Sequence, residues 1–277
     1  MPSIDHPRID CHCHVIDPAR FPFAADTKYR PAGAEIAPVE HLLRIMDRHG
    51  VEHALIVGTN SGYGTDLSPV LDAMARGAGR FKGIAVVAND ITVSDLARLK
   101  TRGIIGVAFN APFHGVGHYA KTDDLLRKMV DLDMILDLQV RGDELLFFLP
   151  AIERSMVRLV IDHCGRPVPG AGLTQPGFQA LLGLGRAGRA SVKLSGFSQF
   201  SGQSYPYDDS APAVAALLDA FTPDRCVWGS DWPFLRAPDR IDYGPLLDRM
   251  DTLVPDATMR RAVLWDTPRR LFGFGAG

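Results

Sequence analysis

Short apolar runs recur along the whole chain of 277 residues, separated by segments with a different hydrophobic spacing. Each run is four to seven residues long, which is typical of a strand buried on both faces. The eight runs span residues 9–15, 53–58, 83–88, 106–110, 134–140, 158–163, 191–194 and 226–230. The pattern therefore predicts about eight buried strands.

The segments between these runs carry apolar residues at every third or fourth position, as amphipathic helices do. One such segment ends at Gly50, a residue type that favours helix termination, and another follows Thr122 and Asp123, which can cap a helix. A third follows residues 208–210, and the last spans residues 257–271.

Alternation of strand and helix, repeated eight times, predicts an α/β fold: a (β/α)8 TIM barrel forming a single domain over residues 1–277. A doubly wound open sheet would show fewer repeats, and no glycine-rich phosphate loop follows the first run.

Composition and charge narrow the class of protein. A hydrophobic content of 46% and a charged content of 22% are ordinary for a globular chain. The net charge of -2 gives no electrostatic case for nucleic acid or an anionic membrane as partner. No run of about 18 apolar residues is present, the start lacks a signal-peptide layout, and the four cysteines are few. We therefore expect a cytoplasmic protein, as a monomer or small homo-oligomer.

Three segments are long and rich in glycine, proline and aromatic residues. They span residues 18–38, 165–177 and 197–212, after the first, sixth and seventh predicted strands. In a TIM barrel the loops after the strands build the active site. These three segments are therefore expected to shape a substrate pocket.

Two histidines separated by one residue lie in the first predicted strand. Side chains alternate between the faces of a strand, so His12 and His14 should share one face, with Cys11 and Cys13 on the other. Two imidazoles on one side of a strand end can bind a metal ion or polarise an oxygen atom of a substrate.

Further polar residues end two other apolar runs. His163 ends the sixth run and Asp231 follows the eighth. Because all strands of a barrel end at the same face, these residues should meet His12 and His14 in one site.

Two forms of chemistry are open to this set. One divalent ion, Zn or Mn, could bind His12, His14, His163 and Asp231 with a free coordination position, which would activate a water molecule. Without a metal, the imidazoles could polarise a carbonyl group while Asp231 accepts a proton from water. Either form attacks an activated carbonyl with water.

Other polar residues close to strand ends are candidates for substrate contacts. They are Asn60, Asn110, Gln139, Arg166, Lys193, Ser195 and Arg236. Lys193 and Ser195 should lie on one face of the seventh strand. Arg141, Arg166 and Arg236 could recognise an anionic group, whereas His114 and His118 are expected on the surface.

Six motifs resemble signatures of the amidohydrolase superfamily. They lie at residues 9–15 (IDCHCHV), 161–167 (IDHCGRP), 172–178 (GLTQPGF), 192–196 (VKLSG), 228–233 (WGSDWP) and 266–273 (DTPRRLFG). The chain is most similar to the branch that contains 2-pyrone-4,6-dicarboxylate lactonase and related sugar-lactone and muconolactone hydrolases. The resemblance implies a distorted barrel and hydrolysis of a lactone, with His12, His14, His163 and Asp231 as catalytic residues.

Two departures from the family pattern refine this expectation. Residues 107–110 and 138–140 lack the bridging ligand and the fifth-strand histidine of two-metal members, so no metal or one ion is expected. Ala108 stands where the pyrone-dicarboxylate enzymes have an arginine, which favours a different, related lactone as the substrate.

Two alternatives stay open at this point. A metal-dependent decarboxylase of an aromatic or muconate-type acid would use the same barrel and a firmly bound divalent ion. A barrel without catalysis could bind a metabolite, since a fold alone does not secure a function.

Overall fold

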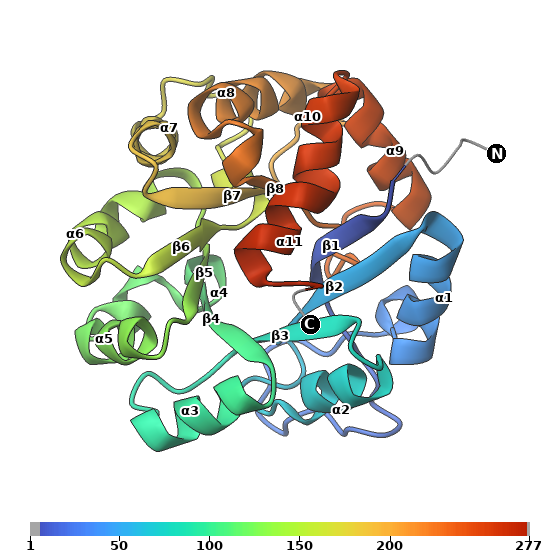
Figure 1. The fold of residues 1–277 in the computed structure, drawn as a ribbon, viewed down its shortest axis with the longest axis vertical. Coiled ribbons are helices and arrows are strands. Elements are labelled where there is room, and N and C mark those ends of the chain that lie inside the picture. Colours follow the sequence, from blue (N-terminus) through green and yellow to red (C-terminus); the bar gives the residue numbers. More distant parts are fainter. Residues whose placement is uncertain (1–5, 276–277) are drawn as a thin grey trace.

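Eight parallel strands form a nearly closed barrel in the computed structural model, which describes residues 6–275 (Figure 1). Each strand pairs with the next along the chain, in the order β1 to β8. Their bounds are β1 (Arg8–Cys13), β2 (Val51–Val57), β3 (Phe81–Ala85), β4 (Ile104–Asn110), β5 (Ile135–Gln139), β6 (Arg158–Ile161), β7 (Ala190–Leu194) and β8 (Cys226–Trp228). The predicted TIM barrel is confirmed, and each predicted strand end lies within three residues of the observed one.

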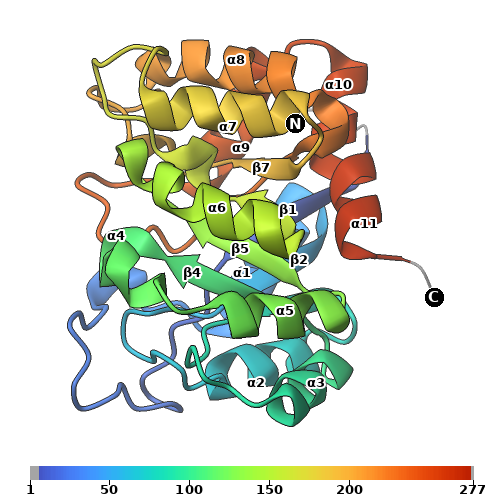
Figure 2. The same ribbon diagram turned by 90° about the vertical axis from the view of Figure 1, so that its left-hand side faces the viewer.

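Helices surround the barrel on its outside (Figures 1 and 2). They are α1 (Val39–His49), α2 (Ser68–Arg76), α3 (Val93–Thr101), α4 (Ala111–His114), α5 (Asp123–Asp131), α6 (Leu145–Ser155), α7 (Pro176–Arg186), α8 (Ala211–Phe221), α9 (Tyr243–Leu253), α10 (Ala257–Arg261) and α11 (Thr267–Phe272). Short 3-10 turns lie at Gly33–Glu35, Val116–Tyr119, Gly142–Glu144, His163–Gly165, Phe197–Gln199, Asp208–Ser210 and Pro223–Arg225.

The helix ends follow from local chemistry. Gly50 ends α1 in the left-handed conformation, with φ of 64°, as its residue type predicts. Thr122 precedes α5 as expected, but its hydroxyl donates to the carbonyl of Tyr119 instead of capping the helix. The single helix predicted over residues 257–271 is divided into α10, a π-helical segment at Ala262–Asp266 and α11.

Apolar side chains pack in two layers. An outer layer lies between the strands and the helices, and an inner cluster fills the barrel. The inner cluster includes Ile9, Val57 and Ile84 and extends to Phe272 and Phe274 near the carboxyl end of the chain. Because Lys82 at the start of β3 donates to the carbonyl of Phe272, this terminal segment closes the end of the barrel at which the strands begin.

An irregularity in β1 changes which way its cysteines face. The register against β2 shifts between Asp10 and Cys13, so β1 holds an extra residue there. Cys11 packs in the inner cluster and Cys13 in the outer layer. The prediction that the two cysteines share one face of the strand is therefore wrong.

Backbone contacts join β1 to the segment that directly follows β8. The amide of Asp231 donates to the carbonyl of His12, and the amide of His14 donates to the carbonyl of Trp232, both at 2.8 Å. These bonds join the first and last strands at the end where the candidate site lies. Within residues 6–275, the helices are too short and too polar to cross a membrane.

Candidate active site

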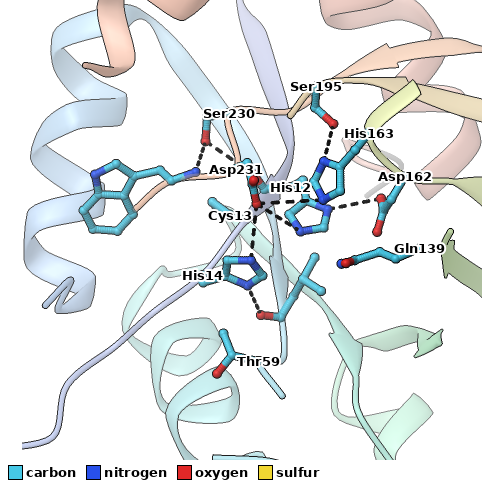
Figure 3. Close-up of polar contacts among 12 residues, drawn as sticks. His12, Cys13, His14, Thr59, Gln139, Asp162, His163, Ser195, Ser230 and Asp231 are labelled. Carbon is cyan, nitrogen blue, oxygen red and sulfur yellow. Dashed lines mark hydrogen bonds and ion pairs between the residues drawn. The ribbon is translucent and has the colours of Figure 1, made fainter. Parts of the chain in front are cut away.

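Three imidazoles surround one carboxylate oxygen at the carboxyl ends of the strands (Figure 3). The Nε2 atoms of His12, His14 and His163 lie 3.7, 3.6 and 3.9 Å from Oδ1 of Asp231. These residues come from β1, from the residue after β1, from the turn after β6 and from the loop after β8. The fold thus brings together all four residues that the sequence singled out as catalytic.

Unusual backbone conformations and close approaches place these side chains. His163 and Asp231 adopt left-handed φ values of 51° and 63°. A Cβ atom on Gly229 would lie 2.7 Å from Cβ of His12, and one on Gly196 would lie 2.7 Å from Nδ1 of His163. Glycine at both positions therefore lets the strand ends approach the imidazoles closely.

Each imidazole is fixed through its Nδ1 atom by a different partner. The three contacts are His12 with Oδ1 of Asp162 at 3.1 Å, His14 with the carbonyl of Val57 at 2.8 Å, and His163 with Oγ of Ser195 at 2.9 Å. A carbonyl oxygen can only accept, so neutral His14 carries its proton on Nδ1 and directs a lone pair on Nε2 toward Asp231.

Burial sets the charge state of the cluster. Burial lowers the pKa of His163 to about 3, and it also lowers the pKa of His12. For Asp231, burial alone would raise the pKa, but the surrounding imidazoles outweigh it and hold the pKa well below the usual range. At neutral pH the site therefore holds an ionised carboxylate among uncharged His12 and His163 rings.

The donor atoms fit a single divalent ion. Nε2 of His12 is buried without a hydrogen-bond partner, and the ligand atoms of His12, His14 and Asp231 lie within 4.8 Å of one another. Two imidazole nitrogens and a carboxylate oxygen suit Zn²⁺, and Nε2 of His163 lies close to the same Asp231 oxygen.

A second group with metal-ligand spacing is less suitable. It combines His12 and His163 with Asp162, whose Oδ1 lies 2.7 Å from the ammonium of Lys193. A cation at that position would compete with the buried ammonium for the same oxygen. The donor chemistry therefore favours one ion, placed beside Asp231.

A cavity of about 430 Å³ opens above this cluster. Its lining includes His14, His163 and Asp231, whereas His12 is fully buried beneath them. Five of the predicted substrate-contact residues also line it: Asn60, Asn110, Gln139, Arg166 and Arg236.

The other two predicted contact residues do not reach the cavity. Lys193 is fully buried one layer below, where its ammonium lies 2.7 Å from both Asp137 and Asp162. Ser195 is also buried and contacts His163. Both face the barrel interior as predicted, but neither lines the cavity, so the expectation that they touch substrate is corrected. Lys193 lies in β7 below the cavity floor, and Ser195, directly after β7, is covered where it contacts the His163 ring.

The loops contribute unequally to the cavity. Residues 234–238, together with Ile241, line it from the loop after β8, which the sequence analysis had not singled out. Of the three long segments, residues 197–199 and Arg166 line the cavity, but no residue of segment 18–38 does. Glu35 of that segment instead accepts a hydrogen bond from the amide of Arg236, so the segment supports the β8 loop from behind.

Sequence reasoning missed two residues that touch the cluster. Asp162 holds His12, and the side-chain amide of Gln199 donates to Oδ2 of Asp231. Asp162 carries a signal that could have been read, since a carboxylate directly after an apolar strand needs a buried partner. Gln199 lies in an irregular turn and carries no such signal.

Of the two loop histidines, His118 is exposed as predicted, whereas His114 is partly buried. Nε2 of His114 lies 2.7 Å from Oδ1 of Asn60, and its ring stacks on His118 at 4.5 Å. Burial is the main cause that lowers the pKa of His114 to about 4, and the nearby His118 and Lys28 add to the effect. These contacts place His114 beside the cavity wall.

The cavity carries positive potential. Arg141, Arg166 and Arg236 line it, and Asp231 is the one acidic residue among its lining residues. The guanidinium of Arg166 has a single protein partner among the described residues, Oε1 of Gln139 at 3.3 Å, and its Nε is buried without one. A guanidinium without a carboxylate partner is suited to an anionic ligand.

The comparison with known proteins identifies the family. The sequence model described as "Amidohydrolase" matches residues 9–274, and the chain belongs to this family. The predicted superfamily is thereby confirmed.

A curated relative and two solved structures refine this placement. A 4-sulfomuconolactone hydrolase from Rhizobium radiobacter is 36% identical over 95% of this chain and 89% of its own length. A crystal structure of a probable 2-pyrone-4,6-dicarboxylic acid hydrolase from Acinetobacter baumannii, with citric acid bound, has a TM-score of 0.89 and 27% identity, covering 97% of this chain and all of that one. An amidohydrolase from Burkholderia multivorans with bound zinc shares the fold, with a TM-score of 0.75 and 19% identity over 97% of this chain and all of that one.

Proposed function

We propose that this protein is a hydrolase that opens the ring of a small anionic lactone. The observation that carries the proposal is the ionised Asp231 among three imidazoles, on the floor of a cavity with three guanidiniums. The relatives named as lactone hydrolases agree with the enzyme class and reaction that the sequence predicted. A small-molecule substrate fits a cavity of this volume.

Substrate orientation follows from the charges in the cavity. A carboxylate or sulfonate of the lactone would bind the guanidinium of Arg166, with Arg141 and Arg236 offering further positive charge. The ring carbonyl would then lie toward His14, His163 and Asp231, because the arginines share the cavity with them.

Asp231 is placed to move the protons of the reaction. Its ionised carboxylate accepts a proton from water as the water oxygen attacks the lactone carbonyl carbon. When the tetrahedral intermediate collapses, the bond from carbon to the ring oxygen breaks, and Asp231 returns the proton to that oxygen. The products are a hydroxyl group and a carboxylic acid on one open chain, and the acid ionises at neutral pH by releasing one proton to the solvent.

Polarisation of the carbonyl needs a positive charge at the imidazoles. His14 presents a lone pair and not a proton on Nε2 when it is neutral, and such a nitrogen binds a cation better than it binds a carbonyl oxygen. We therefore propose one divalent ion, Zn or Mn, held by His12, His14 and Asp231, with His163 beside them. When bound, it would polarise the carbonyl and lower the pKa of a water molecule.

The residue at position 108 and the relatives favour a muconolactone or sugar-acid lactone over a pyrone dicarboxylate. Ala108 is buried in the inner cluster and offers no charge where the pyrone-dicarboxylate enzymes have an arginine. The 4-sulfomuconolactone hydrolase is also the relative with the higher identity of those described above. We further propose a cytoplasmic enzyme, because its four cysteines are free and buried.

A lactone panel tests the proposal. The purified protein is given a muconolactone, a sugar-acid lactone, 2-pyrone-4,6-dicarboxylate and an uncharged lactone, and ring opening is followed by acid release. Metal content is measured alongside, before and after chelation. The proposal predicts hydrolysis of an anionic lactone, and it predicts that activity is lost when chelation removes the ion. Release of carbon dioxide from an aromatic or muconate-type acid, without lactone hydrolysis, would establish the decarboxylase instead.

A further inference from the structure

Two inward-facing residues, Lys193 in β7 and Ser195 directly after it, have no part in the reaction described so far. Lys193 is fully buried and Ser195 is 1% exposed, so neither can touch a substrate in the cavity. Each contacts Nδ1 of a different site histidine. Nζ of Lys193 lies 3.2 Å from Nδ1 of His12, and Oγ of Ser195 lies 2.9 Å from Nδ1 of His163.

Lys193 also acts on His12 through Asp162. Its ammonium lies 2.7 Å from Oδ1 of Asp162, and the same oxygen lies 3.1 Å from Nδ1 of His12. The remaining contact of the ammonium is Oδ2 of Asp137, at 2.7 Å. Lys193 therefore fixes the carboxylate oxygen that fixes the imidazole ring.

Stability alone is a weak reason for this arrangement. Removing an ammonium and two carboxylates from water is costly, and apolar side chains of similar volume stabilise a barrel interior at least as well. The charges also lie in the layer directly below the site, although the inner cluster fills much of the barrel with apolar residues. Their position against His12 indicates a role in the site.

We propose that β7 orients the active site, with Lys193 and Ser195 as positioning residues. Lys193, through Asp162, and Ser195 directly hold the rings of His12 and His163 so that both Nε2 atoms face Asp231. Lys193 lies in β7 and Ser195 follows its last residue, Leu194, so one strand and its immediate end set both rings. This inference deepens the proposed lactone hydrolysis and rests on it.

Three variants separate this role from the alternatives. Lys193→Met removes the ammonium, Ser195→Ala removes the hydroxyl, and Ser191→Ala is the matched control. Ser191 is a buried serine two residues earlier on the same inward face of β7. We expect kcat on an anionic lactone to fall about 10- to 100-fold in the first two variants, with KM within about twofold of the wild type. Ser191→Ala should retain both constants.

A spectroscopic readout keeps the test independent of turnover. The ring-nitrogen chemical shifts of the histidines are measured by NMR in each variant. Lys193→Met should shift the His12 nitrogens and leave those of His163 in place, whereas Ser195→Ala should do the reverse. If Lys193→Met does not fold, Ser195→Ala alone decides the question.

Two results would overturn the inference. Ring-nitrogen chemical shifts of His12 and His163 that stay unchanged in both variants would show that Lys193 and Ser195 do not orient these rings. A rise in KM with kcat retained would instead make Lys193 and Ser195 substrate contacts. A wild-type protein that hydrolyses no lactone would refute the proposed function. The nitrogen chemical shifts would still test whether Lys193 and Ser195 orient the two histidines, because this measurement does not depend on turnover.

Discussion

The guanidinium of Arg166 offers a quantitative test of anion recognition in the cavity. We consider Arg166→Met, which keeps a long unbranched side chain and removes the charge. In the structure this guanidinium contacts only Oε1 of Gln139, at 3.3 Å, among the described residues. The substitution therefore leaves no protein carboxylate unpaired, and the free energy of unfolding should change by less than about 1 kcal/mol.

The cost to catalysis follows from the lost contact with the substrate anion. A hydrogen bond to a charged group contributes about 1.5–3 kcal/mol. Since about 1.4 kcal/mol corresponds to a factor of ten, kcat/KM for an anionic lactone should fall about 10- to 150-fold. An uncharged lactone makes no such contact, so its kcat/KM should change by less than about threefold.

The assay compares both lactones in Arg166→Met and in the control Arg240→Met. Arg240 lies on the loop after β8, does not line the cavity and pairs with Asp242 at 3.1 Å on the surface. The control should match the wild type on both substrates. An equal loss on the charged and uncharged lactones in Arg166→Met would refute anion recognition by this residue.

Two further predictions concern stability and the join between β1 and β8. The pKa of His114 is about 4 in the folded protein and about 6.5 in the unfolded chain, so between these values the unfolded chain binds the extra proton and stability falls as pH falls. Between pH 7 and pH 4.5 the melting temperature of His114→Asn should therefore fall by less than that of the wild type. Equal decreases in the two proteins would contradict a contribution from His114. In Gly229→Ala the new Cβ meets Cβ of His12 at 2.7 Å, so β8 must move away from β1, and we expect both kcat and the melting temperature to fall, kcat by more than about tenfold. Gly183→Ala, in α7 with no atom within 4 Å of the new Cβ, should raise the free energy of unfolding by about 0.5–1 kcal/mol and leave kcat unchanged, as a matched control.

The barrel and the meeting of its polar strand ends could be predicted from the sequence for a common reason. Parallel strands buried on both faces appear as continuous apolar runs, and all strands of a barrel end at the same face. A histidine or aspartate that interrupts such a run at its end is therefore already placed near its counterparts. His163 and Asp231 were found in this way, although they are 68 positions apart in the chain.

Depth within the barrel could not be predicted by the same reasoning. Alternation along β7, continued one residue past its end, correctly predicted that Lys193 and Ser195 face inward, but it does not predict how far below the cavity floor a residue lies. That depth depends on how neighbouring strands are staggered, and the extra residue in β1 shows that the stagger changes locally. The same extra residue separates Cys13, in the outer layer, from Cys11, in the inner cluster, against strict alternation.

Loop length was also an incomplete guide to the cavity. Segment 18–38 is long, yet it contacts the backbone of Arg236 and does not line the cavity. Phe234 and Ile241 do line the cavity, and they lie in the loop after β8, which the sequence pattern did not identify as a long loop. Which loop folds over a site depends on contacts between loops, and local sequence carries little information about such contacts.

Asp231→Asn tests the central claim most directly, because it replaces the carboxylate at the centre of the three imidazoles and keeps the size of the side chain. The measurement is kcat for an anionic lactone that the wild type hydrolyses, with the folded state checked by thermal melting. If Asp231 accepts the proton from water, kcat should fall about 10²- to 10⁴-fold while the protein stays folded. A folded variant whose kcat stays within tenfold of the wild type would contradict the proposed mechanism.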